Sequence, residues 1–243
     1  MRSPRVYHPG RLQVGRDATL DEASSHHLGR VLRMKVGDQV VLFDGTGGEY
    51  RGIIRGVERS GVRVRAEAFD PIERESTLEI GLVQAISAGE RMEFTLQKAV
   101  ELGVAWIQPI ITRRSKVRLG AERAEKRGTH WQRVVNAACE QSGRNRVPAV
   151  RPLLEFTAWL AEPAAVSHRL VLQPNADRRL SESGPLHGSV ELLAGCESGL
   201  DDEEVDLAQR YEFVPVRLGP RVLRTETAGI AALAVFQALW GDF

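Results

Sequence analysis

The feature that most constrains the fold is an alternation of apolar strands and amphipathic helices that begins near residue 77. The run LEIGLVQAI at 78–86 is typical of a buried strand, and the run 90–103 that follows has apolar residues at helical spacing and ends at Gly103. Further strands are expected at 105–111, 169–173, 189–195 and 213–218, and further helices at 121–143, 201–211 and 228–240. Strands that alternate with helices predict an α/β fold with a mostly parallel sheet.

Three segments follow directly after expected strands of this sheet. They are QPNAD at 173–177, GCESGLD at 195–201 and GPRVLR at 219–224. Open α/β sheets bind ligands at the carboxyl ends of their strands. The sequence therefore predicts a ligand site formed by these three loops. Asp201, at the end of the second loop, is expected to cap the helix that follows it.

The first 70 residues have a different pattern and are expected to form a small β-rich module. Strands are expected at 38–45, 49–56 and 61–68, with a Gly-rich hairpin turn between the first two and a short helix at 21–34 before them. Asp70-Pro71 and the polar residues after them favour a turn. We therefore expect a module at 1–70, a linker at 71–76 and a second domain at 77–243.

Charge is balanced over the whole chain but not along it. The formal net charge is +1, yet residues 113–146 hold ten Lys and Arg against three acids, and residues 177–206 hold nine acids against two Arg. A polyanion would favour the first segment. An ordinary solvated helix with mixed charges explains the same pattern, so both interpretations stay open on this evidence alone.

The sequence lacks the motifs of several enzyme classes. It has no G-x-G-x-x-G after a strand, no P-loop, no H-E-x-x-H and no G-x-S-x-G. The two cysteines, Cys139 and Cys196, cannot make a disulfide framework, and no Cys/His spacing resembles a zinc site. We find no apolar leader and no apolar run of membrane length, so we expect a cytoplasmic protein with no membrane segment and no metal.

Several stretches along the whole chain resemble the RsmE family of bacterial small-subunit ribosomal RNA methyltransferases. The most specific is LGPRVLRTETA at 218–228. The others, in order, are PRVYH at 4–8, HLGRVLRM at 27–34, LFDG at 42–45, RMEF at 91–94, QKAVELGV at 97–104 and ACEQSGRNRVP at 138–148. The family makes N3-methyluridine and belongs to the trefoil-knotted SPOUT superfamily.

The resemblance implies a more specific architecture than the residue patterns do. It implies an N-terminal PUA-like β-barrel that binds RNA and a C-terminal SPOUT domain whose chain forms a deep trefoil knot. It also implies S-adenosyl-L-methionine as the cofactor, ribosomal RNA as the substrate, and a homodimer with the active site at the subunit interface. A topology argument would not have predicted a knot, because knots are rare.

The loop after the fifth strand departs from the family pattern. The family usually has G-P-E-G-G, and this chain has Gly195-Cys196-Glu197-Ser198-Gly199. Cys196 replaces a proline that fixes φ, and Ser198 replaces a glycine that tolerates positive φ. If Ser198 adopted a positive φ, the loop would be strained, and its geometry or its affinity for the cofactor would change.

The resemblance also assigns roles to individual residues. Residues expected to bind the cofactor are Leu172, Gly195, Glu197, Ser198, Gly199, Leu218, Gly219, Pro220, Val222, Leu223 and Thr227. Residues expected to bind RNA are Arg2, Arg5, Arg30, Arg33, Arg144, Asn145, Arg146 and Arg221, with the basic segment 113–146 and the arginines of the small module expected to form one positive surface. Catalytic candidates are Arg224, Glu140 and Glu226.

Chemistry explains the residue types just before the last helix. The methyl group of S-adenosylmethionine is already electrophilic. The protein therefore has to bind the cofactor, align its methyl group with uridine N3 and assist loss of the N3 proton. Arg221 and Arg224 suit a phosphate or the negative charge that develops on uracil. Thr225 is a natural N-cap with Glu226 in the first turn, and from the local sequence alone plain capping explains Thr225, Glu226 and Thr227 better than catalysis does. The helix at 228–240 is apolar nearly all round, as in a dimer interface or a central core helix.

Two other functions remain open at this point. One is a non-catalytic RNA-binding or assembly factor, which the altered loop at 195–199 motivates. The other is a methyltransferase of the same superfamily that acts on transfer RNA.

Overall fold

The computed structural model describes residues 3–116, 119–163 and 165–243. The chain divides into two compact units. The first extends to Glu75 and includes Cys139–Val147, and the second comprises Ser76–Ala138 and Pro148–Phe243. The division therefore differs from the expected domains at 1–70 and 77–243, because the segment 139–147 joins the N-terminal unit.

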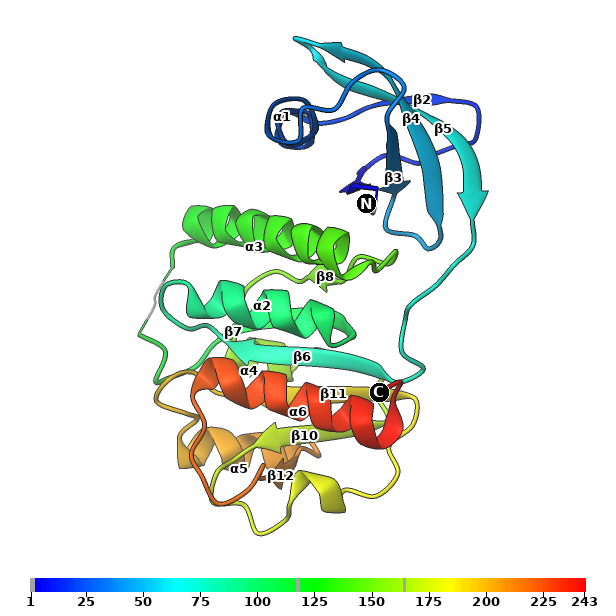
Figure 1. The fold of residues 1–243 in the computed structure, drawn as a ribbon. Coiled ribbons are helices and arrows are strands. Elements are labelled where there is room, and N and C mark those ends of the chain that lie inside the picture. The colour runs from blue at the N-terminus through cyan, green and yellow to red at the C-terminus, as the bar shows by residue number, and fades with distance from the viewer. Residues whose placement is uncertain (1–2, 117–118, 164) are drawn as a thin grey trace. The chain divides into compact units, whose positions relative to one another are not determined.

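The first unit is built on a five-stranded sheet with the strand order β1-β3-β4-β5-β2. The strands are β1 (Arg5–Tyr7), β2 (Asp17–Thr19), β3 (Gln39–Phe43), β4 (Glu49–Glu58) and β5 (Gly61–Asp70). β1 pairs parallel to β3 and the other pairs are antiparallel. Alternate residues point into one core, which contains Val40, Leu42, Ile54, Val62 and Val64. The three longest strands (Figure 1) match the three predicted from sequence.

The helix expected at 21–34 is shorter and less regular than predicted. α1 spans Glu22–His26, with Asp21 as an N-cap that accepts from the Ser24 amide at 2.7 Å. A wide π-helical turn, η1 (His27–Val31), replaces the rest. Gly29 is a weak helix former, and Arg33 at φ +54° turns the chain away, so the helix cannot continue to 34.

The second unit is built on a seven-stranded sheet, ordered β12-β10-β11-β6-β7-β8, with β9 also pairing to β7. The strands are β6 (Glu79–Ala85), β7 (Val104–Ile111), β8 (Ala149–Val150), β9 (Leu154–Glu155), β10 (His168–Leu172), β11 (Ser189–Ala194) and β12 (Val214–Val216). Every one of these pairings is parallel. The predicted α/β fold with a mostly parallel sheet is confirmed.

Helices cover both faces of this sheet, as Figure 1 shows. The helices are α2 (Arg91–Glu101), α3 (Ala121–Ser142), α4 (Phe156–Leu160), α5 (Asp202–Arg210) and α6 (Thr225–Trp240), with a 3-10 turn η2 (Leu180–Glu182). α6 packs against α2 and against β6 and β11. The last turn of α3 belongs to the first unit. α3 continues through Gly128, which faces open space.

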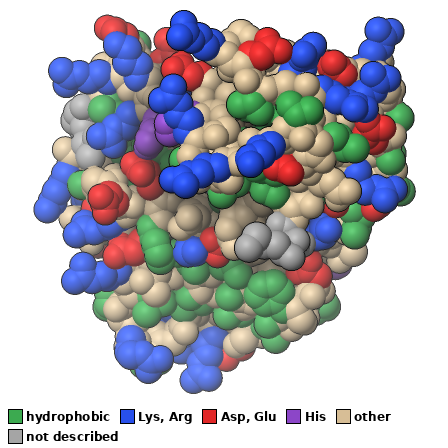
Figure 2. Space-filling model, turned by 45° about the horizontal axis from the view of Figure 1, so that its top comes forward, with side chains coloured by type: hydrophobic (Ala, Val, Ile, Leu, Met, Phe, Trp, Pro, Cys, Tyr) green, Lys and Arg blue, Asp and Glu red, His purple; other side chains and the backbone are tan. Residues whose placement is uncertain are grey.

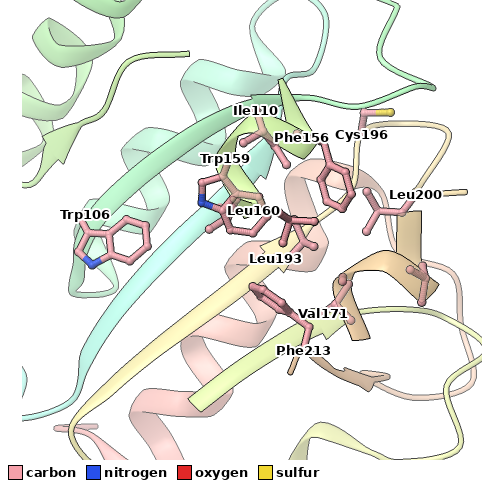
Figure 3. Close-up of a cluster of buried hydrophobic side chains, with 14 residues drawn as sticks. Trp106, Ile110, Phe156, Trp159, Leu160, Val171, Leu193, Cys196, Leu200 and Phe213 are labelled. Atoms are coloured by element: carbon pink, nitrogen blue, oxygen red, sulfur yellow. The ribbon is translucent and has the colours of Figure 1, made fainter. Parts of the chain in front are cut away.

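One of the buried clusters is rich in aromatic side chains. Phe156 and Trp159 of α4 pack with Phe213, and the Trp159 and Phe213 rings meet edge to face with centroids 5.6 Å apart. Figure 3 shows these rings over β10 and β11, with Cys196 and Leu200 at the end of the cluster. The strand-end loop that contains Cys196 is thus anchored in the core by apolar burial.

No helix within the described part of the chain is long and apolar enough to span a bilayer.

Candidate functional site

Three strand-end loops of the second unit surround one cavity of about 390 Å³. β12, β10 and β11 are neighbours in the sheet, so the loops at their carboxyl ends meet, as predicted. The lining residues are Arg114, Leu172, Gln173, Pro174, Asn175, Gly195, Cys196, Glu197, Ser198, Gly199, Leu200, Asp202, Val216, Arg217, Leu218, Gly219, Arg221, Val222, Leu223, Thr225 and Ala228. The volume lies in the range of small-molecule sites.

The loop 195–200 forms one wall, and its backbone is tightly folded. A Cβ at position 195 would lie 2.9 Å from the backbone of Gly199 and Leu200, so only glycine fits there. The Gly199 amide donates to the Cys196 carbonyl at 2.9 Å, and Gly199 has φ +70°. This turn brings the loop's backbone to the cavity wall.

The two departures from the family loop do not strain it. In the described chain the non-glycine residues with positive φ are Arg33 and Glu212, so Ser198 does not have the conformation that we considered costly. The Cys196 side chain is buried, with its Sγ 3.6 Å from the Gly199 carbonyl oxygen and 3.8 Å from the Thr112 hydroxyl. Cys196 thus packs as a small core residue.

Glu197 is fixed by partners outside its own loop. Its Oε1 accepts from the Ala88 amide and from Arg91, each at 2.9 Å. Burial opposes the charge, but these hydrogen bonds and the Arg91 charge outweigh burial and lower the pKa of Glu197. Glu197 therefore lines the cavity as a charged carboxylate that is already paired.

The loop 217–223 forms the opposite wall. Gly219 has φ +137°, and a Cβ there would meet no atom within 4 Å, so this part of the wall is open backbone. Leu218 and Leu223 are partly buried apolar neighbours, whereas Val222 is 80% exposed. Pro220 lies on a neighbouring hollow of about 440 Å³, lined also by Arg179, Leu180, Ser181, Arg217, Leu218, Gly219 and Val235.

A buried polar cluster joins the two walls beneath the cavity. The Thr225 hydroxyl donates to the Gly195 carbonyl at 2.7 Å, and the Gln84 amide donates to both Gly195 O and Thr225 Oγ1 at 3.2 Å. Thr225 is not the N-cap, contrary to the prediction. The N-cap is Arg224, whose side chain makes no capping hydrogen bond, and Thr225 is the first residue of α6. Its hydroxyl instead holds the loop at Gly195.

The three catalytic candidates are divided between the two units. Arg224 and Glu226 are at the start of α6 in the second unit; Arg224 is exposed, and Glu226 Oε2 is a buried atom with no hydrogen-bond partner among the described residues. Glu140 is in the first unit, where its Oε1 accepts from the Tyr7 amide at 2.9 Å. Burial raises the pKa of Glu140. Thr227, expected at the cofactor, is exposed and does not line the cavity.

Three of the expected RNA-binding residues belong instead to a buried network of the first unit. Arg5 pairs with Glu49 and donates to Asn145 Oδ1 at 2.6 Å. Arg144 pairs with Glu75, and the fully buried Asn145 donates to the Ile72 carbonyl at 2.8 Å. The guanidinium groups are occupied by internal carboxylates, so we correct the expectation that Arg5, Arg144 and Asn145 contact RNA.

The remaining expected RNA-binding residues are exposed where they are described. Arg30, Arg33, Arg146 and Arg221 are exposed, and Arg2 lies outside the described residues. Figure 2 shows Lys and Arg side chains interspersed with acidic ones over the face that it draws. Exposed arginines of this kind suit phosphate contacts.

Sequence reasoning missed Arg114, which lines the cavity, and Gln84, which hydrogen-bonds to two cavity residues without lining it. Arg114 follows the end of β7, so it belongs to a fourth strand-end loop that the rule for parallel sheets would have indicated. Gln84 lies inside a strand that is apolar after its first residue, Glu79, and a polar residue within such a buried strand is the signal that could have found it. No group of His, Cys, Asp or Glu in the described residues is arranged to hold a metal.

Comparisons with known proteins agree with this geometry. A family model described as an RNA methyltransferase domain matches residues 74–237, and one described as an RNA methyltransferase PUA domain matches residues 20–67. A ribosomal RNA small subunit methyltransferase E from Buchnera aphidicola is 32% identical, with 99% of this chain and 98% of that protein covered.

Two solved structures resemble the whole chain. One is a putative methyltransferase from Legionella pneumophila in complex with the cofactor SAM, with 41% identity, a TM-score of 0.96 and full coverage of both chains. The other is a ribosomal RNA small subunit methyltransferase E from Neisseria gonorrhoeae bound to S-adenosyl methionine, with 40% identity, a TM-score of 0.92 and full coverage of both chains.

Proposed function

The chain belongs to the ribosomal RNA small subunit methyltransferase E family, and from this premise we propose that it transfers a methyl group from S-adenosylmethionine to N3 of a uridine in small-subunit ribosomal RNA. The observation that carries the proposal is the cavity at the ends of β10, β11 and β12. It lies in a chain of the same fold as two solved structures with that cofactor bound.

The residues of the cavity fit S-adenosylmethionine. The backbone at Gly195 leaves no room for a Cβ, and the open position at Gly219 has no side chain, so backbone amides and carbonyls are accessible to adenine. Leu172, Leu218 and Leu223 supply apolar contact, and the paired Glu197 supplies a carboxylate. When bound, the cofactor supplies an activated methyl group on its sulfonium.

The residues of the protein align the uridine with the methyl group and accept the N3 proton. Uridine N3 carries a proton that must leave when the methyl group arrives. Glu226 Oε2, buried and without a hydrogen-bond partner in the described chain, is the acceptor that we propose. Arg224, exposed at the same helix start, stabilises the negative charge on the uracil oxygens. Glu140 is already bound to the Tyr7 amide and holds β1 in place.

Finer features of the family are part of the same proposal. The C-terminal unit forms a trefoil knot through the loops of the cavity, and the N-terminal sheet closes as a PUA-like barrel that binds RNA. The enzyme acts as a homodimer in the bacterial cytoplasm. Leu239 on α6 and Phe243 beyond it are 49% and 70% exposed, which supports an apolar contact between two copies. Light scattering at several concentrations tests the dimer.

Two measurements test the function. Calorimetry with S-adenosylmethionine should show binding to the purified protein, and its absence would favour a non-catalytic RNA-binding factor. Mass spectrometry of nucleosides from a strain that lacks the protein should show loss of N3-methyluridine from small-subunit ribosomal RNA. Loss of a methylated nucleoside from transfer RNA instead would favour the transfer RNA alternative.

A further inference from the structure

The wall of the cavity formed by residues 195–200 contains a flexible joint at Gly199. Gly199 has φ +70°, and a Cβ placed on it would meet no atom within 4 Å. All six residues of this wall line the cavity. Glycine crosses between backbone conformations at low cost, so rotation at this joint would change the shape of the cavity.

Arg114 bridges the two sides of the joint. Its Nη1 donates to the carbonyl oxygen of Ser198 and to that of Leu200, each at 3.1 Å. These carbonyls belong to the residues on either side of Gly199, so one guanidinium fixes the orientation of both peptides. Hydrogen bonds from a charged donor are stronger than neutral ones.

The backbone around Arg114 is held independently of the wall that it fastens. The Thr112 amide donates to the Ser115 hydroxyl at 3.0 Å, and the Ser115 amide donates to the Thr112 carbonyl at 3.1 Å. The Arg113 amide donates to the buried Glu204 carboxylate at 2.8 Å. These hydrogen bonds hold the turn in place without contributions from the wall residues 195–200, so the turn can support the wall.

The other anchor of the wall does not span the joint. Glu197 is held by the Ala88 amide and Arg91, and it precedes Gly199 in the chain. This anchor fixes the first half of the wall; beyond it, the Gly199 carbonyl oxygen has a weak contact from the Cys196 thiol at 3.6 Å, and the Leu200 side chain is buried. The bridge across the joint thus comes from Arg114.

We propose that Arg114 is a positioning residue that locks the Gly199 joint and so keeps the wall 195–200 in the shape that receives the cofactor. The part of this inference that concerns the cofactor rests on the proposed function; the part that concerns the joint does not. Arg113 provides a matched control, because it is the adjacent arginine, is exposed, and pairs with Asp201 and Glu203 without lining the cavity.

The first experiment needs no cofactor. Hydrogen exchange of peptides covering 195–201 is compared for the wild type, Arg114→Met and Arg113→Met, where Met keeps most of the apolar stem. The Gly199 amide, bound to the Cys196 carbonyl, should exchange at least about tenfold faster in Arg114→Met, because the peptides flanking the joint are released. The Arg113→Met protein should exchange like the wild type. Equal protection of the Gly199 amide from exchange in all three proteins would show that Arg114 does not hold this joint.

The second experiment measures the cofactor. Calorimetry should give an S-adenosylmethionine Kd about tenfold higher for Arg114→Met, equivalent to about 1.4 kcal/mol, and an unchanged Kd for Arg113→Met. At saturating cofactor, kcat should stay within about twofold of the wild type, because a positioning residue changes binding rather than the chemical step. An unchanged Kd, or a lower kcat with an unchanged Kd, would contradict the role. If the wild type does not bind S-adenosylmethionine, the proposed function is refuted. The hydrogen-exchange comparison would still show whether Arg114 holds the backbone at Gly199.

Discussion

The Thr225 hydroxyl donates a hydrogen bond to the carbonyl oxygen of Gly195 across 2.7 Å. This contact joins the start of α6 to the loop after β11, two segments 30 positions apart in sequence. Gln84 from β6 donates to both partners, so three segments are tied together beneath the cavity. The shape of the cavity therefore depends on a buried polar cluster that joins β6, the loop after β11 and α6.

The cluster predicts a binding defect in Thr225→Val. The valine has the shape of threonine but cannot donate to Gly195, and the Gln84 amide loses one acceptor. We expect the Kd for S-adenosylmethionine to rise by about tenfold, measured by calorimetry. Thr225→Ser keeps the hydroxyl and should bind like the wild type. If Thr225→Val and Thr225→Ser bind equally well, the cluster does not shape the cavity.

A side chain at position 219 should obstruct the cofactor. Gly219→Val places a branched side chain at a wall position where nothing else lies within 4 Å. We expect the Kd for S-adenosylmethionine to rise by at least about tenfold, or about 1.4 kcal/mol. Gly184→Val is the control, because Gly184 also has a positive φ of 80° and open surroundings but does not line the cavity. Weak binding in both variants would point to backbone strain rather than obstruction.

Arg224 should act in the chemical step. Because it is exposed at the start of α6 and makes no capping hydrogen bond, its guanidinium is available to the developing charge on uracil. Arg224→Ala should lower kcat by about a hundredfold while the Kd for the cofactor stays constant. Steady-state kinetics at saturating RNA and cofactor measures both. A higher KM for RNA with an unchanged kcat would show that Arg224 binds a phosphate only.

The sequence predicted the elements of the second unit well because their patterns are long and periodic. The three loops at the ends of β10, β11 and β12 were predicted because parallel strands bring their ends to one edge. The two-residue strands β8 and β9 and the five-residue helix α4 were missed, because such short elements have no periodicity.

Contacts between distant segments could not be predicted. The burial of Arg5 and Arg144 depends on Glu49 and Glu75, which lie 44 and 69 positions away in sequence. Without knowledge of these partners, the arginines were predicted to contact RNA because of their charge. Thr225 looks like a cap locally, yet its hydroxyl is used by Gly195. In each case a tertiary partner decided the role of a residue whose local pattern indicated another.

The buried pair of Arg5 and Glu49 should make the stability of the first unit depend on pH. Burial opposes the charge, but Arg5 and Arg74 outweigh it and lower the pKa of Glu49. The carboxylate therefore stabilises the fold above the pKa of the unfolded chain, and this contribution is lost as the pH falls through the lower folded pKa. Glu49→Gln should lower Tm at pH 7 by at least about 3 °C, with a smaller deficit at acid pH.

Glu58 provides the comparison for that measurement. It pairs with Arg63, but the two side chains are 56% and 46% exposed, so Glu58→Gln should change Tm little at either pH. Thermal unfolding of the three proteins across the acid range decides the matter. A deficit in Glu49→Gln that does not shrink on acidification would mean that the carboxylate's charge is not what stabilises the network.

We propose that this chain methylates N3 of a uridine in small-subunit ribosomal RNA. The most direct test incubates the purified protein with S-adenosylmethionine labelled on its methyl group and with small ribosomal subunits from a strain that lacks the enzyme, followed by mass spectrometry of the RNA nucleosides. We predict label in N3-methyluridine of the small-subunit RNA, and its loss with Arg224→Ala. Label in transfer RNA, label at another position of uridine, or no methyl transfer by a protein that binds the cofactor would show that the enzyme has another activity or none.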